Sequence, residues 1–335
     1  MNEKMTILVT AIGSVAGEYV IETLKKLGHR VVGCDIYEKR WLAYADSPDA
    51  FYQVPLVSDV EEYSSTIHGI CVSENVNFIF PLTDIEVDFY NFHREWFNNN
   101  GIVICISPKE TIQVVRDKYS LMQAVARHCT SVKPITTMYL NDFLEDTPDW
   151  GKDDIVFVAK PVDGRSSQGV TFLKSFDEVA FFSNKEKNDK YIIQPYIAGS
   201  RIVVDVVRQP ETGITVCVSR KELLSTTNGC GTSVYVYKDT KLNEMCCEMA
   251  NKLEIVGCVN FEFICDYNGD YYLLECNPRF SAGVEFSALA GCDFVEKHLN
   301  CFRNLPVEGF ILENNMYIAR KWTEVITAKD NNDIS

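Results

Sequence analysis

The first hundred residues alternate between short apolar runs and segments with helical periodicity, and this pattern predicts an α/β domain. Thr6–Thr10 and the run "RVVGCDI" are apolar and β-branched, and between them apolar positions recur at helical spacing from Glu18 to Leu27. Two later runs, "NFIFPLTD" and "GIVICIS", enclose a further helical segment from Val87 to Phe97. Such alternation of strands and helices favours a parallel sheet with right-handed crossovers. Residues 1–112 are therefore expected to form one doubly wound domain.

After this region the pattern changes to apolar runs joined by turns, with helices between them. A helix is predicted to begin near Arg116, in "VVRDKYSLMQAVARH", and strands are predicted in "IVFVAKP" and "KYIIQPYI". A hairpin turned at Glu211–Gly213 and an amphipathic helix in "LNEMCCEMANKLEIVG" follow. Antiparallel hairpins mixed with helices are typical of an α+β body, so the expected fold class is α/β plus α+β.

The last two apolar runs flank Asn268-Gly269, a dipeptide that favours a two-residue hairpin turn. That turn places Glu262 opposite Glu275 and Asn260 opposite Asn277, all on one side of the ribbon. Facing carboxylates repel each other, and a divalent cation between them would remove that penalty. Mg²⁺ prefers carboxylates together with water and phosphate oxygens. The hairpin is therefore predicted to be a metal platform for a nucleotide, and the alternative is a solvated outer face.

A second candidate is the polar loop in "KPVDGRSSQGV", which follows Lys160 at the end of an apolar strand. Glycines let backbone N–H groups approach an anion closely, and serine hydroxyls add hydrogen-bond donors. The loop is therefore a candidate phosphate-binding loop, although an ordinary polar hairpin loop is an alternative.

A third candidate is the turn "AIGSVAG", which lies between the first strand and the first helix. Gly13 and Gly17 do not complete the dinucleotide-binding fingerprint, although Asp35 ends the next strand, where an acid could hold a ribose. An ordinary tight turn between strand and helix is the favoured interpretation.

Composition narrows the function classes. The net charge of −15 argues against a surface that coats nucleic acid, because neutralising phosphates needs clustered Lys and Arg. The thirteen cysteines include no CxxC pair and the five histidines are dispersed, so we expect a reduced, cytoplasmic protein without a zinc site. No apolar run approaches the roughly 18 residues that a membrane-spanning helix needs, and no signal peptide is evident.

In this order along the chain, the segments resemble those of the ATP-grasp superfamily. The branch they resemble most contains the carbamoyl-phosphate-synthase large subunit and the pyrrolysine-biosynthesis ligase, and the likeness runs from about residue 5 to 305. The resemblance implies a Rossmann-like pre-ATP-grasp domain followed by a two-lobed ATP-grasp domain with antiparallel sheets. It divides the chain into the first domain (1–112), a small lid lobe (113–195), a large lobe with the metal site (196–310) and a C-terminal extension (311–335).

The resemblance also implies roles for individual residues. "RDKY" is similar to the segment whose lysine reaches the phosphates, "VAKPVDGRSSQGV" to the second lysine strand with its covering loop, and "YIIQPYIAG" to the adenine hinge. Glu262, Glu275 and Asn277 match metal ligands. The candidate catalytic residues are Arg279, Lys160 and Arg220. The candidate nucleotide-binding residues are Lys118, Lys160, Ser166, Ser167, Gln168, Gly169, Gln194, Pro195, Tyr196, Ile197 and Asp205.

Two departures concern the hinge. Relatives commonly carry an acidic residue after it that can hold the ribose, whereas this chain has Ser200 and Arg201, with Asp205 as a substitute further on. Relatives also often have Glu where this chain has Pro195, which removes a backbone donor.

The function implied by the resemblance is that of an ATP-dependent carboxylate–amine (or carboxylate–thiol) ligase. It would use ATP and Mg²⁺, with Mn²⁺ as an alternative, form an acyl phosphate, and release ADP and phosphate. Thr83 and Asp84 are expected to line the acceptor pocket. The partners expected are a small-molecule carboxylate and amine, with a homodimer as one option and without nucleic acid or membrane. The acid, the amine and the pathway stay open.

Three alternatives remain at this point: an ATP-grasp carboxylase or carbamoyl-phosphate-type kinase, a dinucleotide-dependent oxidoreductase, and a non-catalytic nucleotide-binding protein.

Overall fold

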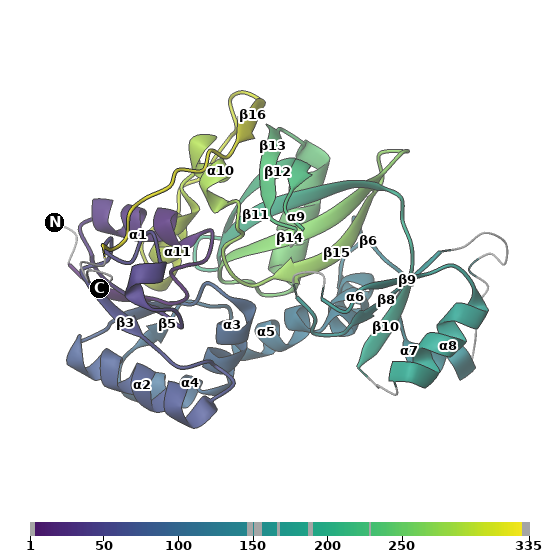
Figure 1. Cartoon of the computed structure of the whole chain (residues 1–335). Helices are drawn as coiled ribbons and strands as arrows, with labels where there is room; N and C mark the ends of the chain where they lie inside the picture. Colours follow the sequence, from purple (N-terminus) through teal and green to yellow (C-terminus); the bar gives the residue numbers. More distant parts are fainter. Residues whose placement is uncertain are drawn as a thin grey trace.

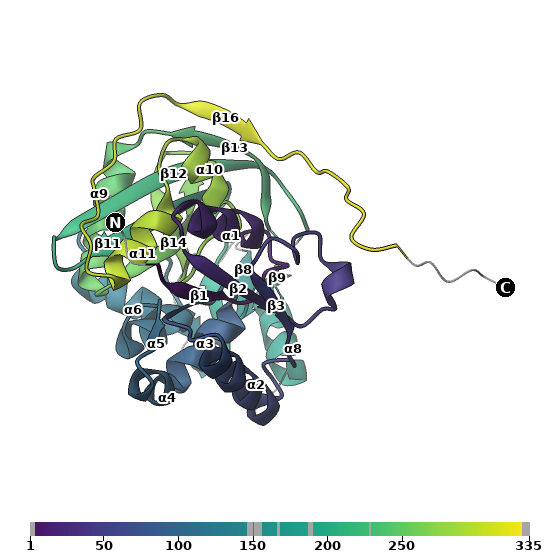
Figure 2. The same ribbon diagram turned by 90° about the vertical axis from the view of Figure 1, so that its left-hand side faces the viewer.

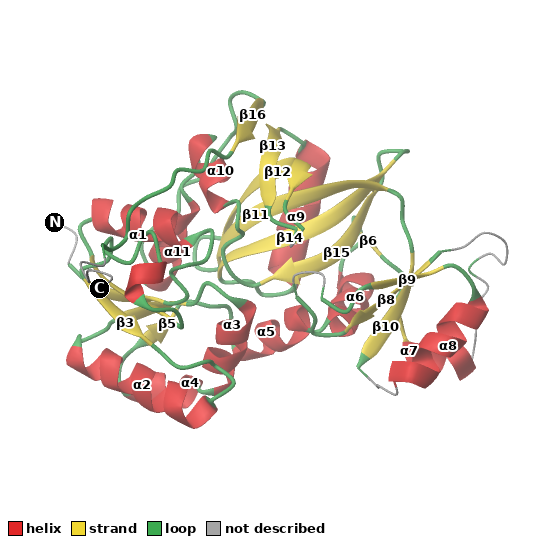
Figure 3. Cartoon of the chain, in the orientation of Figure 1, coloured by secondary structure: helices red, strands yellow, loops and turns green. Residues whose placement is uncertain are grey.

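In the described part of the chain, three β-sheets with their flanking helices form the framework (Figures 1 and 3). The computed structural model describes residues 4–145, 150, 156–165, 168–186, 190–227 and 229–329. The mixture of a parallel sheet and antiparallel sheets confirms the predicted fold class.

The N-terminal sheet is parallel and has the strand order β3-β2-β1-β4-β5. Helices α2 to α4 pack against one face, where Leu8 and Ile79 share a core with Tyr63 and Tyr90. Helix α1 covers the opposite face together with α11 of the second half of the chain. The domain is therefore doubly wound, as predicted. Its elements are β1 (Thr6–Val9), α1 (Gly17–Lys26), β2 (Arg30–Asp35), η1 (Lys39–Trp41), β3 (Ala50–Gln53), α2 (Val60–Ser73), β4 (Phe78–Phe80), α3 (Asp84–Phe92), α4 (Arg94–Asn99) and β5 (Val103–Ile104), and α11 is Phe294–Phe302.

Two predicted helices are each divided in the structure. The segment predicted as one helix from Val87 to Phe97 forms α3 and α4, which meet at His93. The helix predicted to begin near Arg116 is preceded by α5 (Lys109–Arg116), and α6 (Lys118–His128) starts only after Asp117. The Asp117 side chain accepts a hydrogen bond of 2.6 Å from Ser120 N, and this N-cap starts a new helix at Lys118.

The small sheet has the order β7-β10-β8-β9 and is antiparallel. Phe157 and Ala159 of β8 point to a core with α7 and α8, so Val158 and Lys160 point to the other face. The elements are β7 (Met138–Tyr139), α7 (Leu140–Glu145), β8 (Phe157–Pro161), β9 (Thr171–Leu173), α8 (Phe176–Glu186) and β10 (Tyr191–Pro195).

The large sheet has the order β16-β13-β12-β11-β14-β15-β6. The predicted hairpin at Glu211–Gly213 joins β11 to β12. Two of its strands come from outside residues 196–310: β6 pairs parallel to β15, and β16 pairs with β13 before the chain extends away from the sheets (Figure 2). The strands are β6 (Lys133–Pro134), β11 (Gly199–Gln209), β12 (Ile214–Ser225), β13 (Gly231–Tyr237), β14 (Gly257–Asp266), β15 (Tyr271–Asn277) and β16 (Met316–Ala319).

The two faces of the large sheet differ. One packs on α6 and α9 (Thr240–Lys252), and the other packs on α1, α10 (Val284–Leu289) and α11. On the second face, Val207 of β11 and Val218 of β12 belong to the apolar core, whereas Arg220, two residues beyond Val218, and Glu262 of β14 are buried and charged. This face therefore changes along its strands from core to a polar site. None of the described helices is long and apolar enough to span a bilayer.

Glu86 in α3 is buried and yields a prediction about stability. Its carboxylate accepts hydrogen bonds from Thr83 Oγ1 (2.6 Å) and Tyr63 Oη (3.3 Å), but burial still raises its pKa from 4.5 to about 7. Since the folded state favours the protonated form, its contribution to stability is full below pH 4.5 and is lost as the pH rises through 7. At 1.36 kcal/mol per pKa unit, the loss is about 3 kcal/mol.

The difference in unfolding free energy between Glu86→Gln and the wild type should therefore shift by about 3 kcal/mol in favour of the variant as the pH rises from 4.5 to 8. Denaturant unfolding at a series of pH values measures this difference. Parallel pH profiles for the two proteins would show that the carboxyl group is not buried in this way.

Candidate active site

The hairpin β14–β15 brings Glu262 and Glu275 opposite each other, as predicted, but by a different route. The loop has three residues rather than two, because Asp266 N donates to Asp270 O and Gly269 takes a positive φ of 83°. The longer loop alone would shift the pairing of β14 with β15 by one residue from the predicted register. A bulge at Leu274, between the pairs Phe263–Leu273 and Glu262–Glu275, restores it. The predicted turn is therefore wrong, while the predicted pairs, including Asn260 with Asn277, are confirmed.

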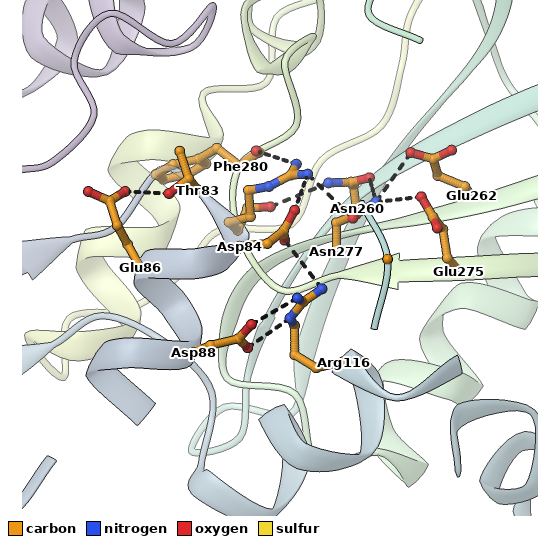
Figure 4. A network of polar contacts seen from close by, with 12 residues as sticks. Thr83, Asp84, Glu86, Asp88, Arg116, Asn260, Glu262, Glu275, Asn277 and Phe280 are labelled. Atoms are coloured by element: carbon orange, nitrogen blue, oxygen red, sulfur yellow. Dashed lines mark hydrogen bonds and ion pairs between the residues drawn. The ribbon is translucent and has the colours of Figure 1, made fainter. Parts of the chain in front are cut away.

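Four polar side chains of this hairpin point to one place (Figure 4). Asn277 Nδ2 lies 3.2 Å from both Asn260 Oδ1 and Glu262 Oε1, and 3.4 Å from Glu275 Oε1. Oxygens that converge on a single donor also form the arrangement that an oxygen-ligated cation requires. The two carboxylates and the amides are the kind of ligand that Mg²⁺ prefers, so the residues present fit such an ion.

Three cationic side chains surround this carboxylate pair. Arg201 binds Glu262 Oε2 through Nε (2.8 Å) and Nη2 (2.6 Å), which leaves Glu262 Oε1 directed to the convergence point. Lys118 Nζ lies 3.7 Å from Glu275 Oε2 and donates to Gly164 O at 2.5 Å. Lys160 is 5% exposed. Buried carboxylates need such partners, since an uncompensated buried charge is strongly unfavourable.

These charges change the pKa values of the site. Burial raises the pKa of Glu262, the facing Glu275 adds to the rise, and Arg201 opposes it. Burial alone would raise the pKa of Glu275 too, but Lys118, Lys160 and Arg201 together lower it. Burial lowers the pKa of Lys160 to about 8, and Glu275 opposes that change. The environment therefore keeps Glu275 anionic at neutral pH, beside a lysine that remains mostly protonated.

A first pocket, of about 240 Å³, opens between the small sheet and this hairpin. One end is apolar and the other carries Lys118, Lys160 and the two glutamates. The hinge residues line the apolar end: Gln194 Nε2 is held by Thr137 Oγ1 at 2.7 Å, and Tyr196 N donates to Val156 O. The residues that line the apolar part are Ile135, Val158, Val170, Phe172, Gln194, Pro195, Tyr196, Ile197, Ile264 and Leu274.

Gln168 also lines the first pocket, and Gly169 has a φ of +74° where a Cβ would approach Pro161 Cγ to 2.8 Å. Glycine is therefore required for this loop conformation. Ser166 and Ser167 lie outside the described residues.

A second pocket, of about 420 Å³, adjoins the first. The two pockets share Arg165, Arg201, Glu262 and Glu275, so the carboxylate pair lies at their junction. The N-terminal domain contributes the turn Ser14–Ala16 and the segment Leu82–Ile85, which includes Thr83 and Asp84 as predicted. The site is thus built from two domains.

Asp84 links the two domains through arginines. Arg279 Nη2 donates to Asp84 Oδ2 at 2.9 Å and to Asn277 Oδ1 at 3.3 Å. Arg116 binds Asp88 with two hydrogen bonds of 2.8 and 2.9 Å, and its Nη1 lies 3.9 Å from Asp84 Oδ1 (Figure 4). Burial would raise the pKa of Asp84, but Arg279 and Arg116 lower it. The Arg279 guanidinium is therefore held between the Asp84 carboxylate and the Asn277 amide oxygen.

Arg220 is fully enclosed rather than a charged strand end. Its guanidinium binds Asp205 Oδ2 (2.7 Å), Ser281 Oγ (2.9 Å) and Glu222 Oε1 (3.3 Å). Asp205 is 0% exposed and also accepts from Ser287 Oγ, so it lies behind Arg220 and outside both pockets. This contradicts a role for Asp205 in holding ribose, because its carboxylate is fully buried and lines neither pocket.

The turn after β1 is an ordinary tight turn. Asp35 Oδ2 accepts from Gly13 N at 2.8 Å and Oδ1 accepts from Tyr37 N at 3.1 Å, so its oxygens serve the backbone. At Gly17 a Cβ would lie 2.0 Å from Ile12 O, which explains the glycine by close packing. Neither group is available for a dinucleotide.

The sequence-based prediction missed the roles of three residues. Arg201 was noted only as a departure from the family, yet it neutralises Glu262. Glu222 shares a strand face with Arg220 at alternate positions, a signal that the motif "SRKE" does contain. Asn260 was paired correctly but not identified as part of the oxygen set.

Comparisons with known proteins agree with this geometry. Residues 187–324 match the family model described as ATP-grasp in the biosynthetic pathway with Ter operon. Residues 7–105 match a PylC-like N-terminal domain. No curated protein sequence matches the chain significantly.

Solved structures show the same fold. A biotin carboxylase from Campylobacter jejuni has a TM-score of 0.75 at 18% identity, covering 91% of this chain and 72% of that one. An N5-carboxyaminoimidazole synthetase from Staphylococcus aureus, complexed with ADP, has a TM-score of 0.72 at 14% identity (94% and 82%). An L-amino acid ligase from Bacillus licheniformis has a TM-score of 0.68 at 14% identity (90% and 75%). The TM-scores show a common fold, and at identities this low the likeness shows the fold alone.

Arg201→Met should destabilise the protein in the absence of divalent cations, because it leaves Glu262 Oε2 without its partner. Loss of a charged hydrogen-bonded pair of this kind costs about 2 kcal/mol, which lowers Tm by on the order of 5 °C. Mg²⁺ with a non-hydrolysable ATP analogue should reduce the difference, and Arg201→Lys is the charge-conserving control. Equal Tm values, or a difference that Mg²⁺ does not change, would contradict this pairing.

Proposed function

Since the chain belongs to the ATP-grasp superfamily, we propose that it is an ATP-dependent carboxylate–amine ligase. It forms a C–N bond through an acyl phosphate and releases ADP and phosphate. The observation that carries the proposal is the convergence of the Glu262, Glu275 and Asn277 side chains at the junction of two pockets. A site at such a junction can hold the phosphates of a nucleotide from one pocket beside a second substrate from the other.

In this proposal the first pocket holds the nucleotide. The adenine ring occupies the apolar end, between Val158 and Phe172 of the small sheet and Leu274 of the large one. Pro195 has no N–H, and the N–H of Tyr196 is bound to Val156 O, so Ile197 is the hinge residue best placed to read the ring. The phosphates then lie over Lys118 and Lys160.

Glu262, Glu275 and Asn277 would hold Mg²⁺, with Mn²⁺ as a substitute, and the ion would supply positive charge against the phosphates. The donor set fits such an ion by its chemistry, and Asn277 would turn its amide oxygen, which now accepts from Arg279, toward the two carboxylates. Arg201 balances the charge of Glu262 from the opposite oxygen.

The reaction depends on positioning the substrates and neutralising charge rather than on covalent catalysis by the protein. A substrate carboxylate oxygen attacks the γ-phosphorus, and the bond to ADP breaks. Lys118 and Lys160 bind the phosphate oxygens as charge moves onto ADP, and Arg279, oriented by Asp84, contacts the transferring phosphoryl group. The amine nitrogen then attacks the acyl carbon, loses a proton, and displaces phosphate.

Arg220 has a different part in this scheme. It lies in the same row across the sheet as Glu262, with Val203 between them, so roughly 10 Å separates the two positions at about 4.8 Å per strand. It therefore contributes to the wall of the second pocket rather than to the phosphates.

Release of phosphate from Mg-ATP, measured across a panel of amino acids and small carboxylic acids with amines, tests the function. At least one acid and amine pair should stimulate turnover. Glu275→Gln should reduce that turnover by about 100-fold or more, because the carboxylate pair is lost, while Tm changes little. Glu244→Gln, at an exposed glutamate of α9, is the matched control.

The ligase proposal fails if the whole panel leaves ATP hydrolysis at its basal rate while a nicotinamide cofactor binds tightly. Near-normal turnover in Glu275→Gln would contradict the metal assignment alone.

A further inference from the structure

The second pocket contains side-chain oxygens that are buried but have no hydrogen-bond partner. Of the six such atoms among the described residues, Ser14 Oγ, Asp84 Oδ1 and Glu222 Oε2 belong to residues that line this pocket, whereas Thr10 Oγ1, Tyr90 Oη and Asp205 Oδ1 lie outside it. The three lining residues come from three separate segments: the turn after β1, the start of α3, and β12. A buried acceptor without a donor is unfavourable, so such a cluster indicates a missing partner.

Two of the three oxygens belong to carboxylates whose other oxygen is occupied. The Glu222 side chain is 8% exposed and its Oε1 accepts from Arg220, while the Asp84 side chain is 5% exposed and its Oδ2 accepts from Arg279. Arg116 Nη1, at 3.9 Å, is too far from Asp84 Oδ1 for a hydrogen bond. Ionised carboxylates can only accept hydrogen bonds, so the missing partner must be a donor.

Three of the four arginines that line the pocket are bound by groups of the protein, and the fourth, Arg165, is exposed at the junction with the first pocket. Arg220 is bound by Asp205, Glu222 and Ser281, and Arg279 by Asp84, Asn277 Oδ1 and Phe280 O. Arg201 is bound by Glu262 and Gly229 O. On the wall formed by Ser14, Asp84 and Glu222, the side-chain oxygens without a hydrogen-bond partner are therefore acceptors, and two of them belong to carboxylates. Burial raises the pKa of Glu222 in spite of Arg220, which is the direction expected for a carboxylate that lacks part of its counter-charge.

We propose that the second pocket recognises a small molecule that carries a primary ammonium group, and that Glu222 Oε2 is the acceptor that binds it. Asp84 Oδ1 and Ser14 Oγ offer further acceptors to the same molecule. The assignment rests on the ligase function proposed above and names its amine-bearing substrate class. It disfavours bicarbonate as the ligand of this wall, because an anion would lie against two carboxylates.

Glu222 is a specificity residue in this proposal. The Arg220–Asp205 pair, which is fully buried, holds Glu222 Oε1 and leaves Oε2 without a hydrogen-bond partner beside Gly231, another residue that lines the pocket. Gly231 of β13 leaves room for this carboxylate, since a Cβ there would lie 1.9 Å from Glu222 Oε2. The position of the free oxygen is therefore determined by the surrounding side chains.

Binding measurements without turnover test the proposal. The twenty amino acids, putrescine and ethanolamine are each compared with the counterpart that lacks the nitrogen, in the presence of Mg²⁺ and a non-hydrolysable ATP analogue. In wild-type protein at least one ammonium compound should bind tenfold or more tightly than its counterpart. Glu222→Gln should reduce that preference by about tenfold, while its affinity for the nucleotide analogue and its Tm stay near wild type.

Two controls accompany this measurement. Glu244→Gln should keep the full preference. The N-trimethylated form of the bound compound should bind wild-type protein at least tenfold more weakly, since it has no N–H to donate. The comparison of the trimethylated and primary ammonium forms uses wild-type protein, so it tests the proposal even if Glu222→Gln does not fold.

The proposal is overturned if no ammonium compound is preferred, if the trimethylated form binds equally well, or if folded Glu222→Gln keeps the preference. Failure of the ligase function has a different signature: the ammonium preference is present, but no compound stimulates ATP turnover. Turnover stimulated only by acids without a nitrogen would overturn the inference and leave ATP-dependent chemistry in place.

Discussion

The repulsion between two facing carboxylates, one buried and one half-buried, is the constraint on which the rest of this site depends. Glu262 and Glu275 face each other on neighbouring strands, on a face of the sheet that is an apolar core further along the same strands. Arg201, Lys118 and Lys160 reduce that repulsion. The remaining oxygens converge on the Asn277 amide at a point where two pockets meet, which is where the proposed cation would lie.

The same constraint links the domains. The hairpin alone can orient the carboxylates, but Arg279 reaches its position only because Asp84, at the start of α3, binds it from the N-terminal domain. Asp84 and Glu222 each commit one oxygen to an arginine and leave the other free. Charge pairing thus serves two purposes here, since it orients the cationic groups that would meet phosphate and leaves acceptors for a second substrate.

Much of this could be predicted from the sequence, because strand faces are set by alternation of apolar residues. The Glu262–Glu275 pair was found in spite of a wrong turn length, since the bulge at Leu274 compensates for the longer loop and keeps the apolar residues inward. Pairings between distant segments have no such local signal. The two-residue strand β6 and the contact of Asp205 with Arg220 therefore became visible only in the fold.

The most direct test of the carboxylate site is a crystal structure with Mn²⁺ and a non-hydrolysable ATP analogue, recorded with anomalous scattering from manganese. The account predicts an anomalous peak between the Glu262, Glu275 and Asn277 side chains, at about 2.1–2.2 Å from their oxygens and in contact with the nucleotide phosphates. Nucleotide bound in the first pocket with no peak between these residues, or with manganese bound elsewhere, would contradict it.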